Sequence, residues 1–317
     1  NYCTTQTPTF PKKASEYVYH ESMRNINTPR PLGIPNPAAY HVLCKYISEI
    51  WPQLLEHFKE TTDGQKYTIS RTHIRKNKKT PSLFAMNYKN WREDGMPEPD
   101  LLIGSKYLVH ADISNCFPSI YTHALSWALV GKEEAKQNQR DNSKWYNKLD
   151  VHTRNLKFGE THGLLIGPHA SNLLSEIILT KIDQQLYNQG WRFIRNIDDY
   201  TCYVPTYESG QLFLNALTEL LRSFDLSLNH KKTSIEELPT ASVEQWVRKI
   251  NTFTAVDSKD TVNFKEVRAY LDLAIDLMRD NNDNAAILNY AIKVLARKKL
   301  TDNAKLYYCK TILHLAV

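Results

Sequence analysis

The stretch RFIRNIDDYTCYV, residues 192 to 204, places two acidic side chains side by side between two β-type runs. Asp198 and Asp199 stand where the pattern predicts the turn of a hairpin. A single aspartate suits a turn because its side chain bonds to the nearby backbone, but two adjacent carboxylates repel each other unless a cation lies beside them. Carboxylate oxygens are the ligands that hard divalent metal ions prefer, so the pair indicates a metal site.

A third carboxylate, Asp112, ends another predicted strand in the run LLIGSKYLVHAD. The end of a central strand beside a hairpin turn is a place where a sheet can bring distant residues together. Two Mg²⁺ ions about 3.5–4 Å apart, held by such carboxylates, activate an attacking hydroxyl and stabilise a leaving group. The three acids therefore indicate nucleotidyl transfer with pyrophosphate leaving, with Mn²⁺ as a substitute metal.

The elements around these acids mix strands and helices and predict an α+β fold, an antiparallel sheet packed on helices. Residues 1–40 are rich in Pro, Thr and Asn, and we expect no regular structure before a helix that starts at Tyr40 and is broken or kinked at Pro52. A basic run with a polar loop follows to about residue 100, and residues 131–160 are expected as loop or exposed helix. Helices are also predicted in these segments: 118–131, 168–186, 209–224, 264–280, 283–298 and 302–316.

Composition excludes several classes of protein. The 317 residues are 42% hydrophobic and carry a net charge of +6, a mild excess that suits a polyanionic partner. The five cysteines are scattered, which fits neither a disulfide framework nor a zinc site. No signal peptide or membrane span is evident, and we expect a cytoplasmic chain that lacks its true start because it begins with Asn1.

Four segments in order resemble the motifs of bacterial reverse transcriptases: YLVHADISNCFPSIYTHALSWALVGK, THGLLIGPHASNLLSEIIL, RNIDDY and LSLNHKKTSIEELP. The upstream stretch RPLGIPNPAAY is similar to the group of unknown-function and phage-defence enzymes, which includes the abortive-infection reverse transcriptases. The resemblance implies a right-hand polymerase with fingers in residues 1–100 and a palm in residues 101–240. It also implies an all-α, thumb-like or helical-repeat region in residues 241–317.

The resemblance also implies roles for single residues. Asp112 and Asp198 would be metal ligands, with Asp199 beside them and the backbone carbonyl of Ile113 facing a metal. Phe117 falls where the family keeps an aromatic gate against a ribose 2′-hydroxyl, which implies deoxynucleotide substrates. Taken alone, Phe117 is more typical of core packing, and its gate role rests wholly on the resemblance.

Further roles follow from the loop and the basic residues. Gly163 and Gly167 would let the backbone approach the incoming base pair, although both also suit a simple turn before a helix. Lys232 would lie near the leaving pyrophosphate. By its position in the sequence alone, a solvated surface lysine is the more common alternative. The candidates for triphosphate or template contacts are Arg30, Arg71 and Arg75.

The sequence departs from the family at three positions. Asn196 stands where an aromatic residue is usual, Leu165 where a proline is usual, and Cys116 replaces a frequent aromatic residue. None of these changes removes an acid. They bear on primer placement and processivity.

Several functions stay open. The leading hypothesis is a bacterial anti-phage enzyme that uses deoxynucleoside triphosphates, an RNA template or noncoding RNA, and a DNA product. Template-independent synthesis primed on a tyrosine of the chain is a variant of it. The alternatives are an RNA-dependent RNA polymerase, which Phe117 opposes, and a catalytically silent nucleic-acid-binding scaffold. Assembly into a homo-oligomer through the helical region also stays open.

Overall fold

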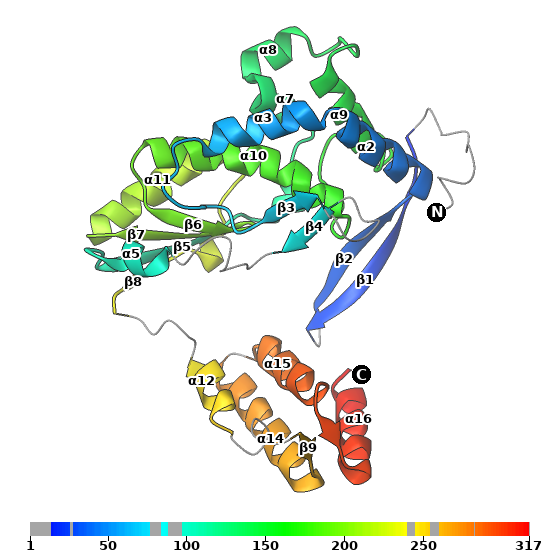
Figure 1. Ribbon diagram of the computed structural model, residues 1–317, viewed down its shortest axis with the longest axis vertical. Coiled ribbons are helices and arrows are strands. Elements are labelled where there is room, and N and C mark those ends of the chain that lie inside the picture. Colours follow the sequence, from blue (N-terminus) through cyan, green and yellow to red (C-terminus); the bar gives the residue numbers. More distant parts are fainter. Residues whose placement is uncertain are drawn as a thin grey trace. The chain divides into compact units, whose positions relative to one another are not determined.

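The computed structural model describes residues 14–25, 28–76, 84–87, 97–239, 245–253, 260–281 and 283–316. The chain forms two compact units (Figure 1): Asn1–His20 with Leu32–Pro239, and Glu21–Pro31 with Thr240–Val317. Residues 32–239 share one unit, and the division into fingers, palm and thumb-like regions stays a prediction. No described helix is long and apolar enough to cross a bilayer.

A four-stranded antiparallel sheet forms the centre of the first unit, in the order β6-β7-β5-β8. Its strands are β5 (Tyr107–Asp112), β6 (Phe193–Asn196), β7 (Asp199–Val204) and β8 (Ser234–Glu237). On β5, Val109 and Ala111 are buried in the core, whereas the intervening His110 is half-buried. This alternation fixes which residue of β5 lies opposite which residue of β7, because a slip of one residue would turn the apolar side chains away from the core.

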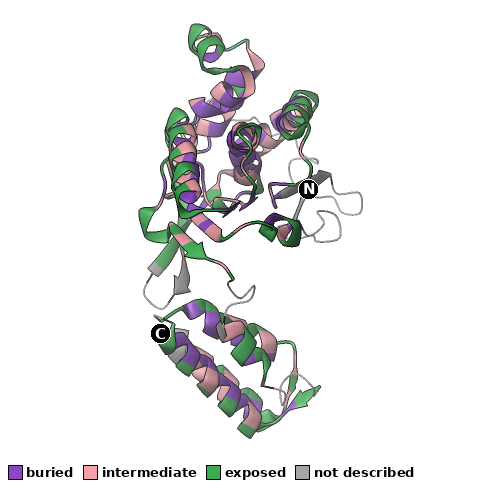
Figure 2. Cartoon of the chain, turned by 90° about the vertical axis from the view of Figure 1, so that its left-hand side faces the viewer, coloured by how far each residue is buried: buried purple, intermediate pink, exposed green. Residues whose placement is uncertain are grey.

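Helices pack on this sheet and on one another. The long helix α10 (His169–Asn188) contacts α3 (Trp51–Thr62), and Figure 1 shows the two lying side by side. Helix α11 (Tyr207–Ser223) packs on β5 and β7. Figure 2 shows buried residues in the interior of this unit and exposed residues at its periphery. The remaining helices of the unit are α2 (Pro37–Glu49), α5 (Glu98–Leu102), α6 (Cys116–Ser119), α7 (His123–Val130), α8 (Lys132–Gln137), α9 (Trp145–Arg154) and the one-turn η1 (His230–Lys232).

The second unit contains the helices α12 (Gln245–Asn251), α14 (Phe264–Asp280), α15 (Ala285–Leu295) and α16 (Asp302–Ala316). They surround their own apolar core, and Asn263 begins α14 with a reciprocal capping box that includes Glu266. The expectation of an all-α region is wrong in one detail, because β9 (Thr261–Val262) and β10 (Lys299–Leu300) form a short parallel pair.

Two expectations for the N-terminal half are corrected, and one is confirmed. Residues 1–40 do contain regular structure: β1 (Tyr17–Asn25) and β2 (Thr28–Pro35) form a two-stranded sheet. The prolines of β2 are compatible with this because a two-stranded sheet has only edge strands. The next helix, α2, starts before Tyr40, where the Asn36 side chain accepts from two backbone N–H groups. Helix α2 ends at Glu49, and α3 begins at Trp51 with Pro52 in its first turn, so the helical run is broken beside Pro52 as predicted.

Three further segments differ from expectation. The expected basic loop contains a pair of antiparallel strands, β3 (His73–Lys76) and β4 (Phe84–Asn87). Within residues 131–160, α8 is largely exposed as expected, whereas α9 packs on α2 and α7 and buries Tyr146 and Leu149. The polar composition of this segment hid the few apolar positions that face the core. The helix expected over residues 118–131 is interrupted between α6 and α7.

The loop between α9 and α10 packs tightly against neighbouring backbone. Gly163 has φ +85°, donates its N–H to the Ile120 carbonyl at 2.9 Å, and would place a Cβ 2.9 Å from the Pro118 carbonyl oxygen. Gly167 has φ +123°, in the region that favours glycine. Contact within the fold therefore already requires a glycine at position 163, apart from any role with a base pair.

We expect Gly163→Ala to lower the free energy of unfolding of the first unit by about 2–4 kcal/mol, from backbone strain and overlap with Pro118. Gly190→Ala is the matched control, because Gly190 has φ +88° with no atom within 4 Å of the added Cβ. It should cost only about 1 kcal/mol. Denaturant unfolding followed by tryptophan fluorescence measures both. Equal losses would show that the Pro118 contact contributes nothing.

Candidate active site

The sheet brings two of the three predicted acids together. Asp112, the last residue of β5, lies directly opposite Asp199, the first residue of β7. Cross-strand partners have Cα atoms about 4.5–5.5 Å apart. Asp198 occupies the two-residue turn that joins β6 to β7, and its carbonyl accepts the Ile113 N–H at 3.1 Å. The end of β5 is thus tied to the turn that carries Asp198.

Two polar side chains bind both oxygens of Asp112, which is 5% exposed. Lys232 Nζ donates to Oδ2 at 2.9 Å, and Asn229 Nδ2 donates to Oδ1 at 3.1 Å. The hydrogen bond to Asp112 raises the pKa of Lys232, and the charges of Asp199 and Asp198 act in the same direction. Lys232 remains charged while its side chain is 64% exposed. The predicted place of Lys232, near a leaving pyrophosphate, stays a prediction.

Like charges crowd around Asp199. Partial loss of hydration is the largest cause that raises the pKa of its carboxyl to about 6, followed by a hydrogen bond with Asp112 and the charge of Asp198, while Lys232 lowers it. The residue as a whole is exposed. A carboxyl that resists ionisation beside two other acids is in the electrostatic condition that a bound cation relieves.

The donor set fits a hard divalent cation. In the described ranges no three His, Cys, Asp or Glu side chains already form a group that could hold a metal ion. The oxygens of Asp112 are bound instead by the Lys232 ammonium and the Asn229 amide. A cation would displace the ammonium and find the Asp112 and Asp199 carboxyls converging, with Asp198 in the adjoining turn. All of these are oxygen ligands of the kind that Mg²⁺ and Mn²⁺ accept.

Phe117 and the glycine loop are joined to each other. Phe117 lies in α6, is half-buried against the main core, and accepts the Leu164 N–H through its carbonyl at 2.7 Å. The Gly167 end of the loop lies against β2, where Gly33 N–H donates to the Ile166 carbonyl at 2.9 Å. The gate and base-pair roles of these residues stay predictions.

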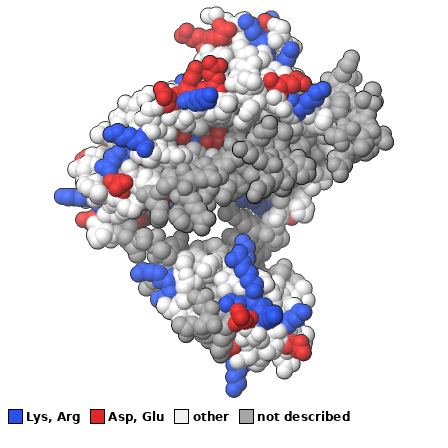
Figure 3. Space-filling model, in the orientation of Figure 1, with Lys and Arg blue, Asp and Glu red and all other residues white. Residues whose placement is uncertain are grey.

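The three arginines differ in how the structure places them. Arg71 is 7% exposed and donates to Glu98 Oε1 at 3.1 Å, so its guanidinium is held within the protein. Arg75 lies on β3 opposite Ala85, but its side chain is outside the described residues. Arg30 is exposed on β2 and belongs to the second unit. On the face drawn in Figure 3, basic and acidic side chains are interspersed, so the charge excess does not by itself locate a nucleic-acid path.

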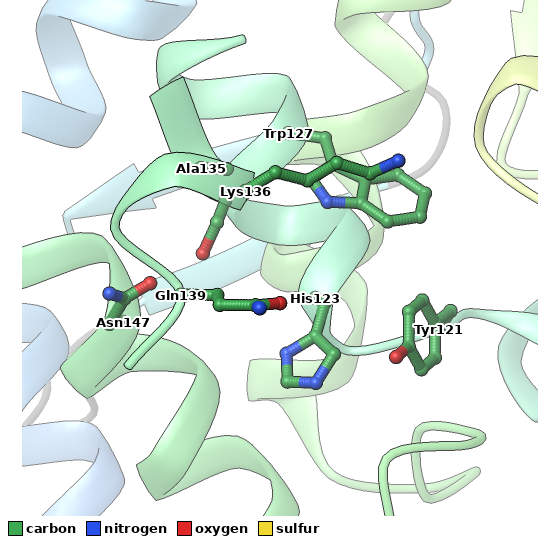
Figure 4. Close-up of a pocket in the computed structure, with 8 residues that line it drawn as sticks. Tyr121, His123, Trp127, Ala135, Lys136, Gln139 and Asn147 are labelled. Atoms are coloured by element: carbon green, nitrogen blue, oxygen red, sulfur yellow. The ribbon is translucent and has the colours of Figure 1, made fainter. Parts of the chain in front are cut away.

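Two pockets of the first unit lie apart from the acids. Figure 4 shows one of about 140 Å³, which Tyr121, His123 and Trp127 line together with polar residues of α8 and α9. There the buried Asp150 binds His123 Nδ1 at 3.0 Å. The other, of about 570 Å³, is lined by Tyr67, Tyr187, Trp191 and their neighbours. Neither is lined by a predicted site residue.

Sequence reasoning missed four residues beside the acids. Asn229 binds Asp112 through both its side chain and its backbone N–H. Arg195, Glu176 and Asp183 form a fully buried ion network directly behind the hairpin turn. A signal for the network was present, because Glu176 and Asp183 lie seven residues apart in α10 and so share one face, between the apolar residues of that helix.

Comparison with known structures identifies the fold. Apo telomerase from Candida tropicalis matches with a TM-score of 0.50 and 9% identity over 98% of this chain and 63% of that chain. A form of it truncated at the C-terminal domain matches with a TM-score of 0.46 and 11% identity, over 74% of this chain and 52% of that chain. Telomerase from Candida albicans, in complex with a fragment of telomeric RNA, matches with a TM-score of 0.44 and 12% identity, over 90% of this chain and 57% of that chain. The chain thus spans between about half and two thirds of these proteins. No curated protein matches it.

A comparison with protein families gives the classification. The family described as reverse transcriptase (RNA-dependent DNA polymerase) matches residues 12–286, most of the chain. The match contains every acid and loop described above. The chain therefore belongs to the reverse transcriptase family.

Proposed function

We propose that this chain is a DNA polymerase that adds deoxynucleotides to a primer, with Asp112, Asp198 and Asp199 as its metal-binding acids. The observation that carries the proposal is the pairing of Asp112 with Asp199 across β5 and β7, beside the turn that holds Asp198. Three carboxyls at one edge of a sheet, in a chain of the reverse transcriptase family, are what two-metal nucleotidyl transfer requires.

The acids and Lys232 would have different roles in nucleotidyl transfer. When bound, divalent cations would supply activation of the primer hydroxyl and neutralisation of the triphosphate. Asp112 and Asp199, with Asp198, would hold them, and Lys232 would be released from Asp112 to offset charge on the leaving pyrophosphate. Positioning and charge neutralisation supply most of the rate acceleration in phosphoryl-group chemistry, so rigid placement of these side chains is central.

A second function has one observation in its favour. Because Lys232 already neutralises Asp112, a silent nucleic-acid-binding scaffold could keep the same fold without any metal. The two proposals differ in whether the purified wild-type protein incorporates deoxynucleotides when a divalent cation is added. The anti-phage role rests on the resemblance of RPLGIPNPAAY and stays a prediction. The cytoplasmic location is an expectation from the sequence and the bacterial source one from the family resemblance, and both stay predictions.

Asp198→Asn should lower Mg²⁺-dependent deoxynucleotide incorporation by about 10³-fold or more, because it removes a ligand charge without changing side-chain size. It should also reduce the Mg²⁺-induced rise in melting temperature, since a cation that binds only the native state stabilises it. Asp225→Asn is the matched control, an exposed turn residue with φ +60° that Asn tolerates well. Wild-type incorporation by a folded Asp198→Asn protein would remove Asp198 from the site.

Phe117→Ala should weaken discrimination between deoxynucleoside and ribonucleoside triphosphates by about tenfold or more, because a smaller side chain admits the 2′-hydroxyl. Phe117→Tyr, which keeps the ring, should retain the wild-type ratio. The measurement is kcat/KM for each triphosphate. Because Phe117 also packs on the core, melting temperatures are compared first. An unchanged ratio in a folded Phe117→Ala protein would mean that the ring packs and does not gate.

The family description favours an RNA template. Purified protein is therefore expected to extend a DNA primer on an RNA template with labelled deoxynucleotides, and to yield little product without added nucleic acid. The alternative, synthesis primed on the protein itself, predicts labelled DNA that stays covalently attached to the chain when template is omitted. Denaturing gel electrophoresis before and after protease digestion separates the two products.

A further inference from the structure

The Arg195 network is the one fully buried ion cluster that touches the candidate active site in the described structure. Arg195, on β6, is 0% exposed, and it faces two carboxylates from one side of α10. Its guanidinium pairs with Asp183 at 2.6 Å and with Glu176 at 2.7 Å. Burying three charges carries a large desolvation cost, and well-packed apolar residues often stabilise a core as well or better. Stability alone therefore does not explain why the chain keeps them.

Every N–H of the guanidinium has an acceptor. The Nε–H contacts Asp183, and the two hydrogens of Nη2 serve Glu176 at 3.0 Å and Asp183 at 2.6 Å. The Nη1 group donates to Glu176 at 2.7 Å and to the backbone carbonyl of Ile197 at 2.7 Å. An arginine offers five N–H donors in a fixed planar arrangement, so the two acids fix the direction in which the fifth donor points. That donor points at the turn.

The turn needs outside support. Ile197 is its first residue and has φ +58°, a left-handed conformation that is strained for a β-branched side chain. Strained backbone of this kind persists only where the surroundings hold it in place. Arg195 holds the carbonyl of Ile197 from the α10 side, and Ile113 N–H holds the carbonyl of Asp198 at 3.1 Å from the β5 side.

These two bonds bracket Asp198. The Ile197 carbonyl belongs to the peptide plane before the Asp198 Cα, and the Asp198 carbonyl belongs to the plane after it. When both planes are held, φ and ψ of Asp198 are fixed, and so is the direction of its Cα–Cβ bond. We propose that Arg195, oriented by Glu176 and Asp183, is a positioning residue that aims the Asp198 carboxylate in nucleotidyl transfer. This inference rests on the proposed function.

A purely structural role is the competing explanation. The same cluster also ties the segment 69–71 to β6, since Ser70 Oγ donates to Glu176 at 2.8 Å, and Arg195 exchanges backbone bonds with Ile69 and Arg71 at 2.9 and 2.8 Å. On that explanation, any replacement that keeps the fold would keep the activity. Arg195→Met alone would leave two buried carboxylates without a partner, and failure to fold would be uninformative.

The test is therefore the triple variant Arg195→Met, Glu176→Leu, Asp183→Leu, which removes all three charges together and is expected to stay folded. Its kcat should fall at least about tenfold, while KM for the deoxynucleotide changes less than about threefold. Arg195→Lys is the second variant, which keeps the charge but lacks the planar fork, and its kcat should fall too. Arg192→Met is the control, an arginine immediately before the same strand whose guanidinium binds the carbonyls of Ile103 and Asp100.

Hydrogen exchange supplies a readout that does not depend on activity. In the triple variant, the Ile113 amide and the turn amides of residues 197–199 should exchange at least about tenfold faster, while amides in the middle of β5 and β7 keep their protection. Wild-type exchange at the turn would overturn the anchoring. Faster exchange with wild-type kcat would overturn the positioning role, and so would wild-type kcat in Arg195→Lys if the triple variant does not fold. A wild-type protein without any incorporation would instead refute the proposed function, while the exchange comparison would still decide the anchoring.

Discussion

The register between β5 and β7 is the constraint on which the candidate site depends. It sets Asp112 opposite Asp199, although like charges directly opposite in an antiparallel pair are destabilising. A slip of one residue would relieve this repulsion but would turn Val109 and Ala111 away from the core. Hydrophobic burial along the middle of the strands therefore holds together an electrostatic arrangement at their ends that would not form by itself.

Charge compensation around these acids occurs on two sides of the hairpin. Lys232 neutralises Asp112 at the exposed side, and Arg195 neutralises Glu176 and Asp183 at the buried side. Groups from both sides act on one buried thiol, that of Cys116. Burial is the largest cause that raises the pKa of this thiol, and the charges of Asp198, Glu176 and Asp112 raise it further, whereas Arg195 lowers it. Five carboxyls with two cations leave this region strongly negative. A bound divalent cation would reduce that excess, which is a physical reason for metal affinity that does not depend on family membership.

Much of this could be predicted from the sequence, for identifiable reasons. The hairpin that carries Asp198 and the helix α14 follow from local patterns of apolar residues and caps, because residues close together in the sequence determine these elements. The contact of Asn229 with Asp112 joins residues 117 positions apart, and no local pattern encodes it. Helix α9 was misjudged because its buried face includes the polar residues Asn147, Asp150 and Thr153, whose partners come from the tertiary structure. The prediction that Asp112 ends a strand is confirmed. For Lys232, the sequence predicted only a place near the leaving pyrophosphate and not its hydrogen bond to Asp112.

The position of strain in the hairpin fits this division between local and tertiary causes. Asn or Gly would adopt a positive φ at position 197 with less strain than Ile, so a turn shaped only by local preference would not carry a β-branched residue there. The turn therefore takes its shape from bonds made by distant elements, α10 through Arg195 and β5 through Ile113. Geometry that depends on such bonds is lost when either element shifts. An enzyme whose reaction depends on where one carboxylate points gains rigidity from such an arrangement at a cost in stability, and strained backbone is concentrated at functional sites for this reason.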